Sequence, residues 1–422
     1  MHLQKTATGK RIKQSCSTEA RRHSHLVVMS SLGHGTNDMY WFILPILLPL
    51  MLDQFKMDYT AAGFLMTAFL FVIALLSFFM GWASDKVSPP IIIGLGFLLA
   101  SGSLLAAGLI QSFAPFIVFL LLTAVGVSTF HPAIYNLINE AIQTRKGWAF
   151  GRFEFWGLTA IFLLVIVAGT LLRVMHWKGV IAVIALPGFV IGALFLRFRR
   201  ELLRDHPDKA YHPDKASASQ RPAASSVAPT GVMPFILLCT SSMLLFLSIT
   251  AVMNFMPTFF VKELGLSPAL ASYTSGFYFF GGMITALLAG RWVDRHSPVW
   301  AYLILCALML PLVLFFSLPL PGWMLPPLLV LLGACAGAFT PSRNMLFAVF
   351  GKQMGSGRVF GIVMAISTIV HSISPTLFGV IADQWGLRAA IRVFTLPVIL
   401  GCISAVAFAQ SIKNQKDAFV SS

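Results

Sequence analysis

Two long stretches of this chain contain no Asp, Glu, Lys or Arg. The first comprises the 53 residues between Lys86 and Glu140, and the second comprises the 47 residues between Arg295 and Arg343. A membrane-spanning helix needs about 20 consecutive apolar residues, so each stretch is long enough for two helices. Each is also interrupted near its middle by a short turn-like segment that contains proline. We therefore predict two pairs of transmembrane helices, each joined by a tight hairpin.

The composition of the whole chain also indicates a membrane protein. Of the 422 residues 57% are hydrophobic and only 11% are charged, against about 25% charged residues in soluble proteins. A soluble core of this size cannot bury so much apolar surface, which excludes a soluble enzyme, a nucleic-acid module and a secreted disulfide scaffold. The predicted fold class is all-α integral membrane. Twelve transmembrane helices are predicted, at 26–51, 59–83, 90–110, 114–139, 149–172, 178–197, 232–260, 268–291, 298–317, 323–349, 358–381 and 387–410.

Lysine and arginine are distributed unevenly between the two ends of these helices. If the N-terminus lies in the cytoplasm, 24 of the 30 basic residues fall in cytoplasmic segments and six fall on the other side. Cytoplasmic loops of membrane proteins carry an excess of Lys and Arg. We therefore predict a multi-pass protein with both termini in the cytoplasm.

Three segments lie outside the predicted helices. Residues 1–25 and 411–422 are polar and are predicted to be cytoplasmic tails. Residues 198–231 are rich in Arg, Asp, Pro, Ala and Ser, a composition typical of a solvated linker. This linker separates an N-terminal six-helix half at 26–197 from a C-terminal six-helix half at 232–410.

The two halves share short motifs at a constant offset. The pattern G-x-x-x-D-[KR]-x-S-P begins at Gly81 and again at Gly290, 209 residues later. Phe-His-Pro at 130–132 aligns with Phe-Thr-Pro at 339–341 at the same offset. We therefore predict a duplicated six-helix unit, in which two parallel repeats are related by an axis along the membrane normal and the binding site lies between them.

With this duplication the sequence resembles the major facilitator superfamily, over essentially the whole chain apart from the tails and the linker. The G-x-x-x-D-[KR] element after the second and eighth predicted helices is similar to the loop motif of that superfamily. Glycine lets two helices touch, and an aspartate at a helix N-terminus interacts favourably with the helix dipole. We interpret the two copies as a conformational latch formed by Gly81, Asp85, Lys86, Gly290, Asp294 and Arg295.

Parts of the first half also resemble the fosmidomycin-resistance group of bacterial efflux proteins. The resemblance lies in Gly-His-Gly-Thr-Asn-Asp at 33–38, in Asp85-Lys86, and in Gly-Val-Ser-Thr-Phe-His-Pro at 126–132. It implies proton-driven export of a small anionic or amphipathic compound across the bacterial cytoplasmic (inner) membrane. The alternative is proton-coupled uptake of an organic anion or similar metabolite, because one cavity can work in both directions. A more distant alternative is a membrane sensor or enzyme that does not transport.

Ionisable side chains inside the predicted spans are candidates for proton coupling. An aspartate at the centre of a membrane helix costs about 2.5–3.5 kcal/mol. Asp38 lies near the centre of the first span, and His34 lies one turn earlier on the same helix face, so the two side chains can exchange a proton. Glu154 in the fifth span is a third candidate. Alternatively, His34 and Asp38 form a buried pair that only holds the first helix against its neighbours.

Other polar residues of the spans are candidates for a substrate cavity. The guanidinium of Arg343 could bind a carboxylate or phosphonate, or it could be a positive-inside anchor near the membrane rim. The two histidines of this group could equally be packed without a ligand. The substrate-cavity candidates are Asn37, His131, Arg152, Asn254, Arg343, Asn344 and His371.

Prolines inside three predicted helices suggest places where these helices bend. A proline removes a backbone hydrogen bond and releases the carbonyl of the residue four positions earlier. In a membrane such a carbonyl must find another partner or line a cavity. We predict helix hinges at Pro132, Pro341 and Pro375.

The sequence contains no constellation of catalytic residues. A nucleophile elbow, a metal-ligand spacing and the phosphate-binding pattern G-x-x-x-x-G-K-[ST] are all absent. We therefore predict that the protein is not an enzyme and uses no cofactor, metal, nucleotide or nucleic acid. The expected partners are the lipid bilayer, a small-molecule substrate and protons, and the expected oligomeric state is a monomer.

Overall fold

The computed structural model describes the backbone of residues 2–84, 86–141, 146–202, 232–295, 297–354 and 356–420. Side chains are described for these residues except at 2–25, 136, 138–141, 146–152, 287, 290–295, 348, 351–354, 356–362, 364–365 and 415–420. All regular secondary structure in these ranges is helical. The prediction of an all-α protein is therefore confirmed.

The helices follow the predicted order. The N-terminal half consists of α1 (His2–Phe55), α2 (Tyr59–Ser84), α3 (Pro89–Leu109), α4 (Phe113–Ser128), α5 (Phe130–Ala141), α6 (Lys146–Leu171), α7 (Trp177–Arg197) and α8 (Arg199–Leu202). The C-terminal half consists of α9 (Val232–Lys262), α10 (Pro268–Arg295), α11 (Pro298–Phe316), a 3₁₀ turn (Gly322–Met324), α12 (Leu325–Met354), α13 (Ser356–Trp385), α14 (Leu387–Val393) and α15 (Thr395–Val420). Each predicted span coincides with one helix or with two consecutive helices.

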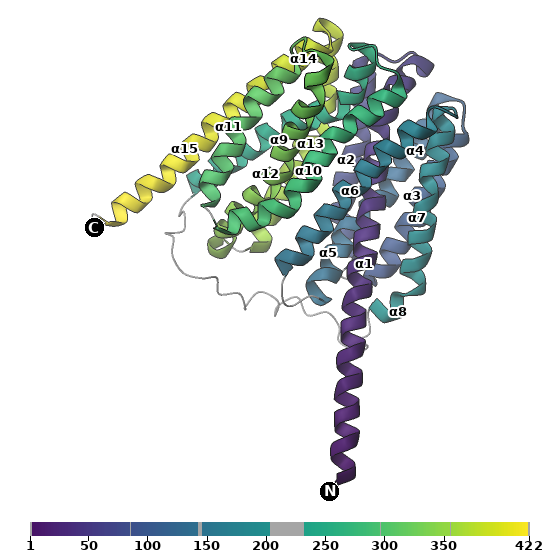
Figure 1. Cartoon of the computed structure of the whole chain (residues 1–422), viewed down its shortest axis with the longest axis vertical. Coiled ribbons are helices and arrows are strands. Elements are labelled where there is room, and N and C mark those ends of the chain that lie inside the picture. Colours follow the sequence, from purple (N-terminus) through teal and green to yellow (C-terminus); the bar gives the residue numbers. More distant parts are fainter. Residues whose placement is uncertain are drawn as a thin grey trace.

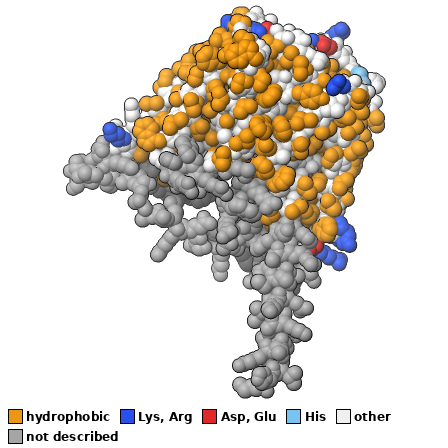
Figure 2. Space-filling view, viewed as in Figure 1, with side chains coloured by type: hydrophobic (Ala, Val, Ile, Leu, Met, Phe, Trp, Pro, Cys, Tyr) orange, Lys and Arg blue, Asp and Glu red, His pale blue; other side chains and the backbone are white. Residues whose placement is uncertain are grey.

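Ten of these twelve spans are long and apolar enough to cross a membrane when the described residues alone are considered. The other two are α1 and α10, which pack within the same bundle. Figure 2 shows hydrophobic side chains covering the visible face, whereas described charged side chains gather toward its ends and edges. Exposed Phe64, Phe78 and Trp300 contribute to the apolar surface. An apolar surface of this extent suits a protein surrounded by lipid.

Two of the predicted helices are broken, each three residues before a proline. The fourth span divides at Thr129 before Pro132, and the twelfth divides at Phe394 before Pro397. Pro132 has no N–H group to donate to the carbonyl of Ser128. This carbonyl instead accepts a hydrogen bond from Ser77 Oγ at 3.2 Å. The broken helix thus keeps its freed backbone group satisfied, as the membrane interior requires.

The other prolines named as hinges do not interrupt their helices. Pro341 lies within α12 and Pro375 within α13, and both helices continue through them. A hinge at these two positions therefore stays a prediction. The predicted linker differs slightly from the structure at its start, because α8 is helical and buries Leu202. Residues 203–231 lie outside the described residues.

Both chain termini lie at one end of the bundle, which we call the terminal end, and the opposite end is the distal end (Figure 1). At the distal end the two halves are joined by side chains. Lys262 Nζ at the end of α9 forms an ion pair with Asp53 near the end of α1. Thr376 of α13 donates a hydrogen bond to Thr67 of α2 between their Oγ1 atoms, at 2.7 Å.

A carboxylate of the C-terminal half caps a helix of the N-terminal half at this distal end. Asp383 near the end of α13 accepts hydrogen bonds from the backbone nitrogens of Tyr59 and Thr60, at 2.9 and 2.7 Å, and from Thr60 Oγ1 at 2.6 Å. These groups begin α2, where unpaired N–H groups and the helix dipole favour a negative charge. Asp383 is therefore a latch between the halves that the sequence analysis did not predict.

Glycines allow the backbones of α2 and α13 to touch beside this latch. A Cβ atom on Gly63 would lie 2.2 Å from the carbonyl oxygen of Pro375, and one on Gly379 would lie 2.1 Å from that of Tyr59. Such distances are far below van der Waals contact. The contact between α2 and α13 at the distal end therefore depends on the absence of side chains at both positions.

Candidate functional site

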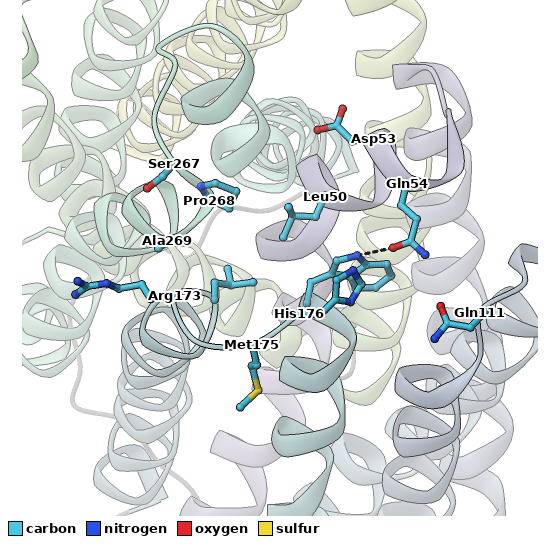
Figure 3. A pocket seen from close by; sticks show the side chains of 12 residues that line it. Leu50, Asp53, Gln54, Gln111, Arg173, Met175, His176, Ser267, Pro268 and Ala269 are labelled. Carbon is cyan, nitrogen blue, oxygen red and sulfur yellow. Dashed lines mark hydrogen bonds between the residues drawn. The ribbon is translucent and has the colours of Figure 1, made fainter.

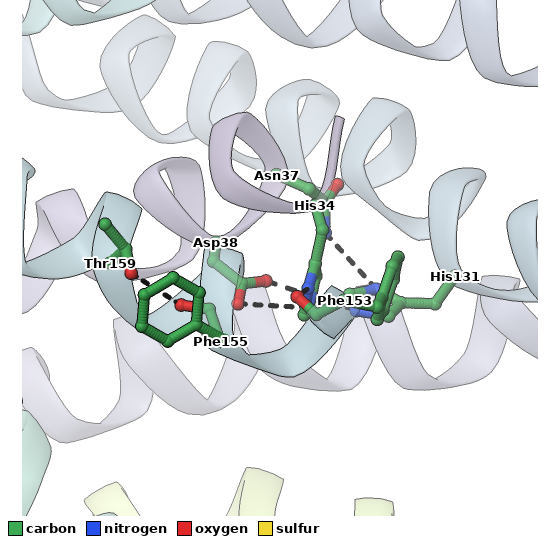
Figure 4. Close-up of polar contacts among 7 residues, drawn as sticks. All are labelled: His34, Asn37, Asp38, His131, Phe153, Phe155 and Thr159. Carbon is green, nitrogen blue, oxygen red and sulfur yellow. Dashed lines mark hydrogen bonds and ion pairs between the residues drawn. The ribbon is translucent and has the colours of Figure 1, made fainter. Parts of the chain in front are cut away.

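His34 and Asp38 of α1 face each other inside the N-terminal half. His34 Nε2 lies 3.2 Å from Asp38 Oδ2 (Figure 4), and the His34 side chain is almost fully buried. The two residues are four positions apart on one helix, so their side chains lie on the same face. The predicted contact within this pair is confirmed, whereas its role in proton coupling stays a prediction.

The hydrogen bonds of His34 fix how many protons the pair contains. His34 Nδ1 lies 2.8 Å from the carbonyl oxygen of Phe153 in α6, and a carbonyl only accepts, so Nδ1 carries a proton. In a neutral ring Nε2 is then an acceptor. An ionised Asp38 also only accepts, so their contact requires one more proton between them. Either Asp38 is protonated and donates to Nε2, or His34 is protonated and donates to Asp38.

A second histidine lies beside this pair. His131 Nε2 of α5 is 4.0 Å from Asp38 Oδ1, and its Nδ1 lies 3.3 Å from the side-chain nitrogen of Asn37. The amide nitrogen donates, so Nδ1 of His131 accepts and its ring proton lies on Nε2, facing Asp38. Asp38 thus has two neighbouring imidazole rings, whose centroids lie 5.2 Å apart, and is only partly exposed.

These three side chains are also the one cluster of the described residues that is close enough to share a metal ion, with candidate ligand atoms within 4.8 Å of one another. A histidine binds a metal through an unprotonated ring nitrogen. The Phe153 carbonyl holds a proton on His34 Nδ1 and leaves its Nε2 lone pair free, but the amide of Asn37 occupies the lone pair of His131 Nδ1, so the Nε2 of His131 that faces Asp38 carries a proton. The arrangement therefore suits a shared proton better than a metal ion.

Aromatic and glycine residues hold this site together. The rings of His34 and Phe153 stack with their centroids 3.8 Å apart and their planes within 6°. Gly157, one turn after Phe153, lets α6 approach the pair: an added Cβ would lie 2.6 Å from His34 Cε1 and 2.7 Å from Asp38 Oδ2. Neither residue stood out in the sequence, because glycines and phenylalanines are frequent throughout the chain.

Gly157→Ala is therefore expected to damage the site without changing any polar group. The methyl group must push α6 away or turn the His34 and Asp38 side chains, either of which lengthens their contact. If the pair couples transport to protons, as the sequence predicts, transport driven by a pH gradient should fall about tenfold, since overpacking costs about 1–3 kcal/mol. Gradient-driven uptake into vesicles measures this. Gly102→Ala is the matched control because a Cβ there meets no atom within 4 Å, and equal activity of both variants would contradict the prediction.

Glu154 of α6 and Arg343 of α12 belong to different halves. Glu154 is exposed and interacts electrostatically with His34, Asp38 and Arg343. Arg343 is buried at 7% exposure, so it does not reach solvent as a rim anchor would. All three proton-coupling candidates therefore interact electrostatically, and Glu154 also interacts with Arg343 of the opposite half.

The surroundings of Arg343 contain further predicted residues. Arg343 Nε and Nη2 donate to Asn344 Oδ1 at 3.2 and 3.0 Å, and its guanidinium lies 4.4 Å from the ring centroid of Phe246. His371 lies against the same ring, with centroids 4.7 Å apart. Asn254 is separate from this cluster, since its side-chain nitrogen donates to the carbonyl of Thr250 on its own helix. Phe246 was not predicted.

The residues of the predicted latch are only partly described. A Cβ atom added to Gly81 would lie 3.8 Å from Pro132 Cβ, which is an ordinary van der Waals distance. Lys86 is exposed and lies over the ring of neighbouring Trp82, 3.8 Å from its centroid, which is a local contact. Asp85 and the side chains of Gly290, Asp294 and Arg295 lie outside the described residues, as does that of Arg152, so the latch and any role of Arg152 stay predictions.

A separate cavity of about 820 Å³ lies at the distal end between the halves (Figure 3). It is lined from the N-terminal half by residues that include Leu50, Arg173 and His176, and from the C-terminal half by Ser267–Ala269. None of the predicted site residues lines it. This cavity is therefore distinct from the site around Asp38.

The fold and the paired polar groups within two six-helix halves define a multi-pass membrane transporter. The profile of the Major Facilitator Superfamily matches residues 31–239 and 238–418, and the chain belongs to this family. It is a transporter and not an enzyme, which confirms that prediction and the predicted fold class.

Individual relatives are named as resistance proteins or as a transport protein. The chain is 21% identical to the fosmidomycin resistance protein of Escherichia coli K12 over 394 residues, covering 92% of this chain and 94% of that protein. It is 25% identical to the multidrug resistance protein MdtG of Enterobacter lignolyticus over 338 residues, covering 78% of each. It is 24% identical to the cis,cis-muconate transport protein of Acinetobacter baylyi over 274 residues, covering 63% and 66%.

Solved structures share the fold. A bacterial homologue of the lysosomal transporter Spinster, in an inward-facing and unoccupied conformation, matches with a TM-score of 0.75 at 12% identity and covers 93% of this chain and 98% of its own. The nucleoside transporter NupG matches with a TM-score of 0.61 at 16% identity, covering 92% and 99%. At these identities the comparison concerns the fold alone.

Proposed function

We propose that the protein is a proton-coupled exporter of a small anionic or amphipathic compound in the bacterial inner membrane. In this proposal His34 and Asp38 bind and release the coupling proton. The exchange of one proton for substrate is driven by the proton gradient, and the two halves rock about the central site so that it faces each side in turn. Two relatives named as resistance proteins support the export direction.

The observation that carries this proposal is the proton count of the His34 and Asp38 pair. Their contact at 3.2 Å needs one shared proton, because the other nitrogen of His34 is committed to the Phe153 carbonyl. Loss of that proton leaves two acceptors facing each other. The Nε2–H group of His131, 4.0 Å from Asp38, is the donor best placed to meet the carboxylate once the proton has left. The pair therefore has two arrangements that differ by one proton, which is what a coupling site requires.

The orientation follows from the basic residues. We propose that the terminal end faces the cytoplasm, because 24 of the 30 Lys and Arg residues belong to the segments that the sequence predicts to be cytoplasmic. The distal end, where the halves are joined, then faces outward, and we propose that the site opens toward the cytoplasm in this state. We further propose that one chain is sufficient for transport, since each half supplies part of the site.

A second candidate function is proton-coupled uptake of an organic anion. It is favoured by the buried cation Arg343 and by the relative named as a cis,cis-muconate transport protein. In this case the anion and the proton move together. A bound anion near Asp38 strengthens proton binding, because the negative charges then favour protonation of the carboxyl group.

The sign of the proton change on substrate binding separates these functions. The experiment adds organic anions and lipophilic drugs to purified protein in weakly buffered detergent solution and records the pH. Proton release on binding supports exchange and therefore export, whereas proton uptake supports cotransport. Binding without any proton change, measured across pH 5 to 9, would contradict proton coupling in both forms. A variant with Asp58, an exposed residue at the start of α2, changed to Asn is the control for proton changes unrelated to the site.

A further inference from the structure

The surroundings of Arg343 suggest what part of a substrate it binds. Arg343 is buried, with 7% of the residue exposed, yet among the described residues no carboxylate lies within 4.0 Å of its guanidinium. A buried charge without a counter-ion is costly, and such groups are normally paired. The one side-chain acceptor it contacts in the described part of the chain is the neutral amide oxygen of Asn344.

The neighbours of Arg343 hold its guanidinium in place. Asn344 accepts from two of its nitrogens and Phe246 lies against its plane at 4.4 Å, so its orientation is fixed before a ligand binds. The nearby His371 Nε2 is buried and has no hydrogen-bond partner among the described residues. Asn344 is exposed, and Glu154 is an exposed carboxylate of the opposite half within electrostatic range.

We propose that Arg343 binds the carboxylate or phosphonate group of the substrate, with His371 as a second polar contact. The substrate class is then organic anions, and neutral or cationic drugs are excluded. The planar guanidinium presents parallel N–H groups that match both kinds of anion. This inference rests on the proposed transport function, for which it names the substrate class and its anchoring residue.

The relation between the two halves explains why an anion here can influence the proton site. Glu154 interacts electrostatically with Arg343 as well as with His34 and Asp38. An anion bound to Arg343 offsets the positive charge that acts on Glu154, and its own negative charge favours protonation of the pair. Anion binding at the C-terminal half therefore promotes proton binding in the N-terminal half without direct contact between substrate and Asp38, which is the sign expected for the uptake candidate.

The test compares probes of one shape and different charge on purified full-length protein. Phenylphosphonate and benzoate carry the anionic groups, benzamide is the neutral counterpart, and benzylamine is the cation. Binding is followed by tryptophan fluorescence in a buffer without a proton gradient. We expect both anions to bind and the other two probes to bind at least tenfold more weakly. Equal affinity for benzamide and benzoate would overturn the proposal.

Variants assign the binding to Arg343. Arg343→Gln should weaken benzoate binding about 10- to 100-fold, since a charge-assisted hydrogen-bond pair is lost. The affinity of Arg343→Lys for benzoate should lie between those of the wild type and Arg343→Gln, because lysine keeps the positive charge but loses the parallel N–H groups of the guanidinium. Arg173→Gln changes an exposed arginine of the distal cavity and should bind benzoate like the wild type.

A second variant serves if Arg343→Gln fails to fold. Phe246→Leu removes the ring that orients the guanidinium. It should weaken the binding of both anions by a common factor and leave the binding of benzylamine unchanged. Unaltered anion binding in the folded variants contradicts the assignment.

These experiments separate failure of the anion site at Arg343 from failure of the proposed proton coupling. If anions bind to Arg343 but no substrate moves protons, the anion site stands and proton coupling falls. If the protein exchanges protons for a neutral or cationic compound and binds no anion, proton coupling stands and this inference is wrong.

Discussion

Asp38→Asn is expected to abolish transport driven by a pH gradient while substrate binding persists. Asparagine has nearly the same shape as aspartic acid, and its amide can still donate to His34 Nε2 across the 3.2 Å contact, but it cannot release a proton. Proton-driven flux in proteoliposomes should therefore drop by at least about 100-fold, the range typical of removing a proton-transfer group. Substrate exchange across vesicles without a pH gradient should continue, because it does not need the proton to leave.

The matched control for this variant is Asp58→Asn. Asp58 is exposed and its Oδ1 accepts a hydrogen bond from the backbone nitrogen of Ala61 at 2.7 Å, a cap that asparagine replaces well. This control should transport like the wild type. Gradient-driven transport by Asp38→Asn at wild-type rates would show that the pair with His34 only holds α1 in place, which is the alternative reading of its burial.

Gly63→Ala is expected to hold the distal end open and to slow transport in both directions. Its Cβ would lie 2.2 Å from the carbonyl oxygen of Pro375, so α2 and α13 must separate. Overpacking of this kind costs about 1–3 kcal/mol, which reduces the population of the closed state by about 5- to 150-fold. The Asp383 cap and the hydrogen bond between Thr376 and Thr67 are lost together with it.

The opening is measured by labelling a cysteine at position 376 in a chain whose five natural cysteines are replaced by serine. A water-soluble maleimide should react with Thr376→Cys slowly in the parent and at least about fivefold faster after Gly63→Ala. Gly102→Ala adds the same methyl group where no atom lies within 4 Å and should not change the rate. Equal labelling in all three proteins would mean that the α2 and α13 contact is not the gate.

The sequence predicted the contacts of the site that join residues of one helix. His34 and Asp38 are separated by four positions, and helix geometry alone places them together. Contacts between helices were not visible in this way. The carbonyl of Phe153 that sets the proton on His34, and the glycine at 157 that admits α6, depend on how two helices approach, and no spacing along the chain encodes that approach.

The polar residues of the second half illustrate the same limit. Arg343 could be named because charge is rare in a membrane span, yet its burial against Phe246 and His371 follows from the packing of α9, α12 and α13. Asp383 was not named at all. Near the end of a helix, a charged residue is ordinarily an exposed one, and only the meeting of α13 with the start of α2 makes it a cap.

The sequence by itself determined the membrane class, the number of spans, the duplication and the candidate ion pair. These properties follow from local composition and from a repeat along the chain, because lipid imposes the same length and polarity on every span. The tertiary structure decided which polar groups pair, where two helices break and at which end of the bundle side chains join the two halves. Those features arise from contacts between residues far apart in sequence, whose geometry depends on the packing of all the helices together.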